Sequence, residues 1–180
     1  NEPSQILQAL DCGARGIVIP QVNSAAEAKA AVKAARYYPQ GERGVAGIVR
    51  AARYGFLPFA DYAAGVNREV MVLTQVEHVD AVANLDEILT IEGLDGTFVG
   101  PADLSQSMGI SGQFDNPVYR DMVAMIIKKT KLAGKVAGIF CFHAADAKHW
   151  ISVGADLVVI GADHMLISSA ARTLVSQLRG

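Results

Sequence analysis

Basic runs, aromatic residues and long hydrophobic stretches are all scarce in this sequence. The 180 residues carry a formal net charge of −2, and only 7% of them are aromatic. Scattered Lys and Arg residues give no support for binding to nucleic acid or to an anionic membrane surface. No apolar run reaches the ~18–20 residues of a membrane-spanning helix, and no signal peptide is recognisable. We expect a cytoplasmic protein with neither nucleic acid nor membrane as partner.

Cysteines and nucleotide-binding motifs are also few or missing. The two cysteines, Cys12 and Cys141, share no spacing typical of a metal site. Both lie in apolar stretches, so we expect both to be small buried residues in a reducing cytosol. No glycine-rich dinucleotide fingerprint follows a strand, and no phosphate-binding loop motif occurs. The sequence therefore gives no motif that indicates nucleotide binding.

The composition that remains indicates one domain, residues 1–180, with a large buried core. Hydrophobic residues make up 51% and charged residues 19% of the chain, which is typical of strands buried on both faces beneath helices. Short apolar runs predict five strands, each followed by a helix: 16–22, 70–76, 96–99, 136–140 and 157–160. This alternation predicts an α/β fold with a parallel sheet.

The segments between these strands predict mostly helices. Ser24 and Glu27 form a capping-box pattern that predicts a helix up to about residue 37. Further helices are expected at 1–12, 59–66, 79–89, 117–133, 144–153 and 166–178, and a loop from 100 to 112. Residues 38–57 predict a long loop that contains Arg43, Arg50 and Arg53. These arginines either neutralise an acidic substrate, hold the loop together or contact another subunit.

Two architectures fit this pattern: an open five-stranded doubly wound sheet, or part of a closed barrel. A helix precedes the first strand, so the βα repeat looks interrupted rather than started. Polar residues also recur near strand C-termini, where barrel enzymes place their active sites: Gln75, Glu77, Asp103, His143 and Asp163. A complete barrel has eight strands in ~250 residues. We favour the last five βα units of a (β/α)8 barrel.

Glu77 and Asp103 are the candidate metal ligands. Gln75 and Glu77 share one face of their strand, and Asp103 follows the end of the next strand. Two carboxylates without a His or Cys pair make an oxygen-rich site that suits Mg²⁺ or Mn²⁺. Such an ion would polarise the keto group of a 2-oxo acid and stabilise an enolate. The alternative is that both acids only cap or begin helices.

The segment Gly100-Pro101-Ala102-Asp103 is the candidate site for the substrate carboxylate. Gly100 and Pro101 would turn the backbone so that the amides of Ala102 and Asp103 face an anion. His78 points away from Glu77 along the strand, so we expect it to be peripheral. No Lys lies at a strand end, which argues against a Schiff-base aldolase.

Four ordered motifs resemble the HpcH/HpaI aldolases, the class II 2-oxo acid aldolases of the phosphoenolpyruvate/pyruvate barrel type. The resemblance covers essentially the whole chain. The motifs are Asp11-x-Gly13-Ala14-x-Gly16 with Ile19-Pro20-x-Val22, Arg36-Tyr37-x-Pro39-x-Gly41-x-Arg43-Gly44, Gln75-Val76-Glu77, and Gly100-Pro101-Ala102-Asp103-Leu104-Ser105.

The resemblance implies a (β/α)8 barrel that holds Mg²⁺, Mn²⁺ or Co²⁺ through Glu77 and Asp103. Gln75 would orient pyruvate, and the backbone of Ala102 and Asp103 would bind its carboxylate. The implied reaction is reversible cleavage of a 4-hydroxy-2-oxo acid, of the heptanedioate or 3-deoxyglucarate type, to pyruvate and an aldehyde. The implied assembly is a hexamer in which a C-terminal helix packs on a neighbouring subunit.

The resemblance also implies groups that these residues lack. The family places a catalytic His and a substrate-binding Arg on its early strands, which correspond to positions before Asn1. We expect an intact protein longer by roughly 70 residues, the shortfall from a full barrel. Two other functions stay open: a citrate-lyase-like acyl-CoA lyase or enolate-forming decarboxylase on the same scaffold, and a truncated, non-catalytic subunit.

Overall fold

The computed structural model describes residues 1–179, and its strands form one parallel sheet. All four neighbouring pairs are parallel. The strands lie in the same order in the sheet as in the sequence: β1 (Gly16–Ile19), β2 (Met71–Val76), β3 (Gly96–Val99), β4 (Val136–Cys141) and β5 (Leu157–Ile160). All five predicted strands are confirmed.

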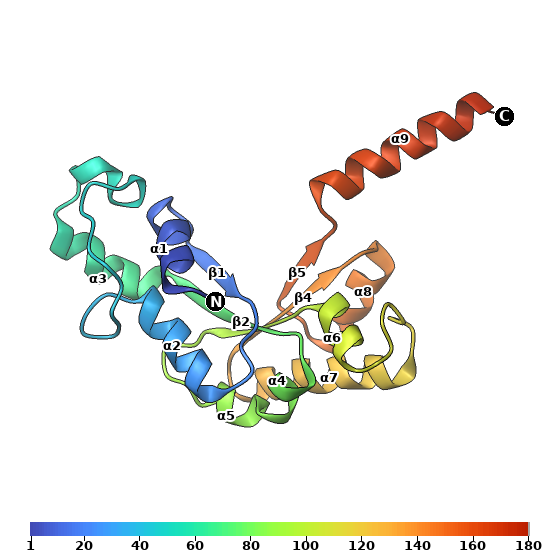
Figure 1. The fold of residues 1–180 in the computed structure, drawn as a ribbon, viewed down its shortest axis with the longest axis horizontal. Coiled ribbons are helices and arrows are strands. Elements are labelled where there is room, and N and C mark those ends of the chain that lie inside the picture. The colour runs from blue at the N-terminus through green and yellow to red at the C-terminus, as the bar shows by residue number, and fades with distance from the viewer. Residues whose placement is uncertain (180) are drawn as a thin grey trace.

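This strand order decides between the two architectures left open by the sequence. A doubly wound sheet reverses its strand order at a switch point, whereas the order here advances in one direction without reversal. The five strands therefore form a half-barrel. Figure 1 shows the strands in the middle of the molecule, with helices around the outside.

Helices precede, connect and follow the strands. Several of these helices pack against the strands, and some of the short ones lie at strand ends. They are α1 (Pro3–Asp11), α2 (Ala25–Ala35), η1 (Arg50–Gly55), α3 (Phe59–Glu69), α4 (Val79–Ala83), α5 (Leu85–Leu89), α6 (Pro101–Ser107), α7 (Pro117–Leu132), α8 (Ala144–Val153) and α9 (Asp163–Arg179). The predicted capping box at Ser24 and Glu27 begins α2.

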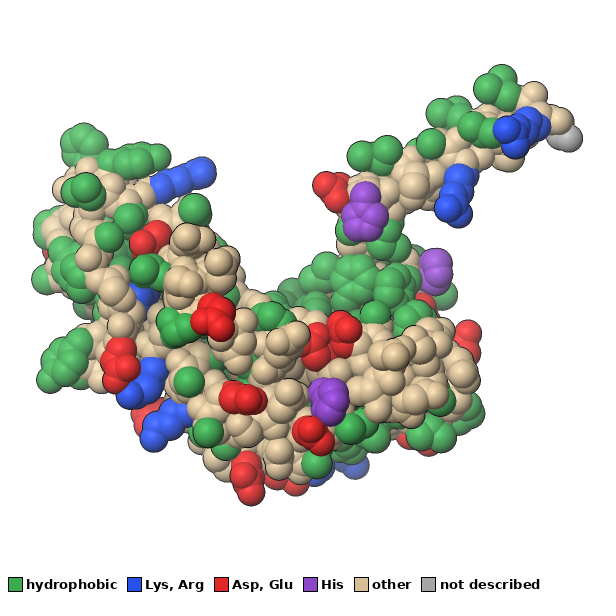
Figure 2. Space-filling view, in the orientation of Figure 1, with side chains coloured by type: hydrophobic (Ala, Val, Ile, Leu, Met, Phe, Trp, Pro, Cys, Tyr) green, Lys and Arg blue, Asp and Glu red, His purple; other side chains and the backbone are tan. Residues whose placement is uncertain are grey.

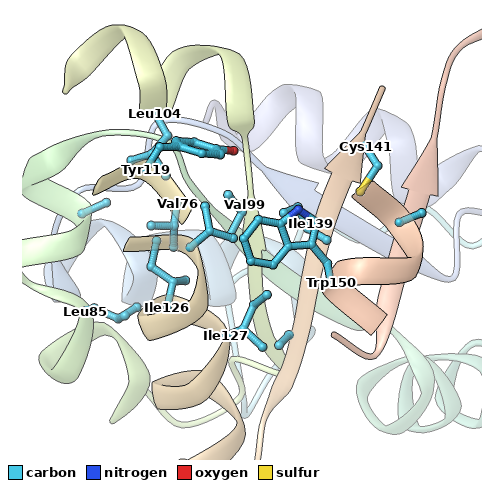
Figure 3. Close-up of a cluster of buried hydrophobic side chains, with 14 of the residues drawn as sticks. Val76, Leu85, Val99, Leu104, Tyr119, Ile126, Ile127, Ile139, Cys141 and Trp150 are labelled. Carbon is cyan, nitrogen blue, oxygen red and sulfur yellow. The ribbon is translucent and has the colours of Figure 1, made fainter. Parts of the chain in front are cut away.

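The main core lies between the outer face of the sheet and α7. Figure 3 shows Ile126 and Ile127 of α7 beside Val76 of β2 and Val99 of β3, and all four side chains are buried. Because side chains alternate along a strand, burial of Val76 and Val99 outward turns Gln75 and Phe98 toward the inside of the half-barrel. Replacing a side chain such as Ile126 by Ala would cost about 2–5 kcal/mol.

Two predicted segments near the strand C-termini differ from the structure: the 79–89 helix is interrupted at one residue, and the 100–112 loop prediction was wrong. The predicted helix over 79–89 is divided into α4 and α5 at Asn84, whose side-chain amide donates to the carbonyl oxygen of Asn23 at 2.8 Å. The backbone of Asn84 has φ −95° and ψ 8°, outside helical geometry. The predicted loop from 100 to 112 begins instead with helix α6, because Pro101 occupies the first helical position.

The prediction for Cys12 was also wrong. Cys141 is buried as expected, but Cys12 is exposed. Cys12 terminates α1, where its amide donates to the carbonyl oxygen of Gln8 while its side chain is exposed. Apolar neighbours in sequence do not decide burial at a helix end, because the chain turns there.

Arg43 holds the long 38–57 segment together, which was one of its three predicted roles. Its side chain is fully buried and pairs with Asp11 of α1 at 2.7 Å. The guanidinium carbon also lies 4.6 Å from the centre of the Tyr37 ring, a cation–π geometry. The guanidinium of Arg43 therefore makes its contacts within the fold, with Asp11 and Tyr37.

Helix α9 extends away from the rest of the molecule. Figures 1 and 2 show it projecting from the end of β5, with hydrophobic side chains along its length. Leu166, Ile167 and Leu174 are each more than 60% exposed. Among residues 1–179, no helix combines the length and the apolar character needed to cross a membrane.

Candidate functional site

A cavity of about 810 Å³ opens at the C-terminal ends of β1, β2 and β3. It brings together Gln75, Glu77 and Asp103, three of the residues singled out from the sequence. The other lining residues are polar or small: Pro20, Gln21, Asn23, Glu27, His78, Gln106 and Ser107. Because parallel strands bring their carboxyl ends to one edge, residues far apart in sequence meet here.

Glu77 occupies the centre of this site. It follows directly after β2, and only 8% of its surface is exposed. One carboxylate oxygen, Oε1, accepts a 2.7 Å hydrogen bond from the backbone N–H of Gln21. The other, Oε2, accepts a hydrogen bond from the side-chain amide of Gln75. The carboxylate of Glu77 is therefore held by Gln75 of β2 and by Gln21, which lies just past the end of β1.

Burial is the main influence on the charge of Glu77. It raises the pKa of the Glu77 carboxyl above its ordinary value, because burial penalises the charged form. The hydrogen bond from Gln21 opposes this rise in pKa, and the nearby negative charge of Asp103 adds to it. No Lys or Arg side chain of residues 1–179 forms an ion pair with either acid. A cation bound by the two carboxylates would lower the pKa of Glu77 and so oppose both the burial and the charge of Asp103.

Asp103 approaches Glu77 from the neighbouring strand end. It lies in the first turn of α6, and its side chain is exposed to the cavity. Gly100 precedes α6 as its capping residue, with Pro101 at the first helical position. The amides of Ala102 and Asp103 belong to this first turn, where N–H groups have no partner inside the helix. Gly100 thus caps α6, and Pro101, Ala102 and Asp103 form its first turn beside Glu77.

Gly100 is in close contact with the Gln75–Glu77 pair. A Cβ atom at Gly100 would lie 2.4 Å from Nε2 of Gln75 and 3.0 Å from Oε2 of Glu77. Real Cβ atoms do not approach other atoms this closely, so a side chain at position 100 would displace the Gln75 amide. Because Gly100 has no side chain, the Gln75 amide can pack against its backbone.

The donor set suits a hard divalent cation. Two carboxylates with amide and hydroxyl neighbours match the oxygen ligands of Mg²⁺ or Mn²⁺. Within residues 1–179, no three His, Cys, Asp or Glu side chains gather into a potential metal cluster. Two protein carboxylates leave the remaining coordination positions to water or substrate, which is usual for Mg²⁺.

The sequence interpretation missed several cavity residues. Gln21, Asn23, Gln106 and Ser107 all line the cavity, and no signal in their residue types indicated it. His78 also lines it, although its ring accepts a 3.2 Å hydrogen bond from the Asp80 amide and caps α4. His143 occupies the N-cap position of α8, but its side chain makes no capping hydrogen bond. It does not line the cavity.

Comparisons with known proteins identify the family of this chain. The model of the HpcH/HpaI aldolase/citrate lyase family matches residues 2–170. The 4-hydroxy-2-oxo-heptane-1,7-dioate aldolase of Shigella sonnei is 40% identical over 178 residues, which are 98% of this chain and 67% of the aldolase. The chain thus spans about two thirds of the length of this curated relative.

Solved structures give the same picture. An HpcH/HpaI aldolase/citrate lyase family protein from Burkholderia cenocepacia superposes with a TM-score of 0.91 and 35% identity, covering 99% of this chain and 70% of that protein. The citrate lyase β subunit of M. tuberculosis, solved with oxaloacetate and magnesium, has a TM-score of 0.52 at 16% identity. The superposition covers 84% of this chain and 57% of the β subunit, and this similarity concerns the fold alone.

Proposed function

The chain belongs to the HpcH/HpaI aldolase/citrate lyase family, and on this premise we propose that it is a divalent-metal-dependent aldolase. The substrate would be a 4-hydroxy-2-oxo acid, cleaved reversibly to pyruvate and an aldehyde. The observation that carries the proposal is the pairing of buried Glu77 with Asp103 at adjacent strand ends, with no cationic side chain among the residues that line the cavity.

Glu77 and Asp103 would hold the metal, which is Mg²⁺, Mn²⁺ or Co²⁺. When bound, such an ion supplies Lewis-acid polarisation of a carbonyl oxygen. The Glu77 carboxylate is already oriented by its two hydrogen bonds, from Gln21 and from Gln75. Fixed orientation of a ligand side chain supports metal affinity, because little rotational freedom is lost on binding.

Gln75 and the start of α6 would bind the 2-oxo acid itself. The Gln75 amide lies between Glu77 and the backbone of Gly100, so it can reach a keto or carboxylate oxygen at the same place. The amides of Ala102 and Asp103 would donate to the substrate carboxylate. Together these groups would orient pyruvate in one plane and keep its keto oxygen toward the two acids.

A coupled assay on the full-length protein tests the proposal, because the family's catalytic His and substrate-binding Arg are expected before Asn1. Pyruvate released from 4-hydroxy-2-oxoheptanedioate is followed by NADH oxidation with lactate dehydrogenase, with Mn²⁺ and with EDTA. We expect EDTA and Glu77→Ala each to lower the rate by at least about 100-fold, since a Lewis-acid metal contributes several kcal/mol. Glu69→Ala is the matched control, because Glu69 is an exposed acid on α3.

The same assay separates the alternatives. Pyruvate release that survives both EDTA and Glu77→Ala would overturn the metal-ligand proposal. Pyruvate formed from oxaloacetate but not from 4-hydroxy-2-oxo acids would indicate the decarboxylase, and cleavage only of a citryl or malyl thioester would indicate the acyl-CoA lyase. A chain that binds Mn²⁺ and turns over none of these substrates would be the non-catalytic subunit.

We also propose that residues 1–180 act as one domain within a homo-oligomer, of hexameric size by family resemblance. The exposed apolar side chains of α9 support this proposal, because large exposed apolar patches mark interaction sites. Light scattering after size-exclusion chromatography measures the assembly. Leu166→Asp with Leu174→Asp should shift it toward monomers, and unchanged mass would contradict the proposed role of α9.

A further inference from the structure

Gln21 adopts an unusual backbone conformation beside the candidate metal ligands. It follows Pro20 just past the end of β1, and its φ angle is +55°. Residues with a side chain rarely adopt this left-handed region, because Cβ crowds the backbone there. Backbone conformations of this kind persist where the surrounding structure holds them, and they cluster at functional sites.

The left-handed turn directs the backbone N–H of Gln21 at Glu77. The N–H donates to Oε1 of Glu77 at 2.7 Å, across 56 positions of sequence. The other oxygen of Glu77 accepts from Gln75, which lies on β2. Gln21 thus holds Glu77 from the segment after β1, and its bond and the bond from Gln75 together fix the plane of the carboxylate.

We propose that Gln21 is a positioning residue that orients the Glu77 carboxylate for a divalent cation through its backbone N–H. This inference rests on the proposed function, in which Glu77 is a metal ligand. The side chain of Gln21 is not needed for this role, since the backbone makes the contact. A residue at position 21 must only tolerate the left-handed conformation.

Variants at position 21 separate the backbone role from that of the side chain. Gln21→Ile disfavours a positive φ, because β-branched residues fit this region poorly. Gln21→Gly removes the side chain, tolerates a positive φ and keeps the N–H. Gln21→Ala is a milder change that preserves a test if the Ile variant does not fold.

The chain offers a matched control at Tyr54. Its φ angle is +56°, close to that of Gln21, and it lies in η1 rather than along the cavity of Glu77 and Asp103. Tyr54→Ile and Tyr54→Gly therefore impose the same backbone changes away from the site. Any effect of left-handed strain on folding alone should appear in both pairs of variants.

Mn²⁺ binding to the full chain, followed by the electron paramagnetic resonance of free Mn²⁺, measures the effect. We expect Gln21→Ile to raise the Kd about tenfold, the lower end of what loss of a ligand-orienting partner causes. Gln21→Ala should raise the Kd by less, and Gln21→Gly by no more than about threefold. Tyr54→Ile should lower the thermal unfolding temperature without raising the Kd.

Amide exchange tests the hydrogen bond without any metal. In the metal-free protein the Gln21 amide should exchange slowly, and Glu77→Ala should accelerate its exchange at least about tenfold. Glu69→Ala should leave its exchange rate unchanged. Fast exchange in the parent protein would overturn the inference, because the bond would then not persist.

The outcomes separate the two proposals. A parent protein that binds no Mn²⁺ overturns the metal site and the positioning role together. A parent that binds Mn²⁺ with the same Kd as Gln21→Ile overturns the positioning role alone. A Gln21→Gly variant as weak as Gln21→Ile also overturns it, since the side chain would then be responsible.

Discussion

The side-chain amide of Gln75 packs directly against the backbone of Gly100, and a side chain at position 100 would occupy the same space. A Cβ atom at position 100 would lie 2.4 Å from Nε2 of Gln75. This contact joins the end of β3 to the end of β2, and it keeps the Gln75 amide on the carboxylate of Glu77. The shape of the candidate site therefore depends on a glycine as much as on its acids.

Gly100→Ala should disrupt the site while leaving the fold intact. The φ of Gly100 is −94°, which any residue adopts, so the added methyl group acts by displacing Gln75. We expect Mn²⁺ or pyruvate affinity to fall 10- to 100-fold, as for other losses of groups that orient a ligand. Calorimetric titration measures both affinities.

Gly65→Ala is the control for Gly100→Ala. Gly65 lies inside α3, and a Cβ there meets no atom within 4 Å. The substitution should stabilise the helix by roughly 0.5–1 kcal/mol and leave both affinities unchanged. Equal affinities for Gly100→Ala and the parent would contradict the packing argument.

Arg43→Ala should destabilise the fold strongly. The change removes one partner of a buried ion pair and leaves the carboxylate of Asp11 without its guanidinium. We expect a loss of about 3–5 kcal/mol in the free energy of unfolding, measured by urea denaturation. Lys129→Ala breaks the exposed pair with Asp86 and should change stability by no more than about 1 kcal/mol. Similar losses for the two variants would show that burial is unimportant at Arg43.

Ser24→Ala should weaken the start of α2. The Ser24 hydroxyl accepts from the Glu27 amide at 3.3 Å, and Glu27 accepts in return from the amides of Asn23 and Ser24. Loss of a capping side chain typically costs about 1 kcal/mol, measurable as a lower urea midpoint. Ser168→Ala, in the exposed helix α9, is the control and should have no such effect.

The two cysteines should differ in reactivity. Cys12 is exposed, whereas burial raises the pKa of the Cys141 thiol to about 11. A disulfide reagent at pH 8 should modify Cys12 within minutes and Cys141 only after unfolding, because the thiolate is the reactive form. Modification of both thiols at one rate in the folded protein would contradict the burial of Cys141.

The raised pKa of Cys141 predicts that the free energy of unfolding falls at alkaline pH. A raised pKa in the folded state means that the unfolded thiol loses its proton first. The stabilisation is therefore complete below the ordinary pKa of 9.0 and declines as pH rises toward about 11. Urea denaturation from pH 8 to 11 should show this decline, and Cys141→Ala should flatten it.

The sequence by itself determined the five strands and the face of β2 that carries the candidate site. Strand period two places Gln75 and Glu77 on one side, and apolar runs mark all five strands. The capping box at Ser24 and Glu27 is a local pattern over four residues, so it was predictable without a fold. Local periodicity and capping act over a few residues, which is the range that sequence patterns report.

Only the tertiary structure decided how these elements meet. The order of strands in the sheet excludes the doubly wound alternative. The predicted 79–89 helix is interrupted at Asn84, whose side chain contacts Asn23. The hydrogen bond from Gln21 to Glu77 and the contact of Gly100 with Gln75 depend on the register of neighbouring strands. Register sets contacts between residues far apart in sequence, and no local pattern around Gln21 contains that information.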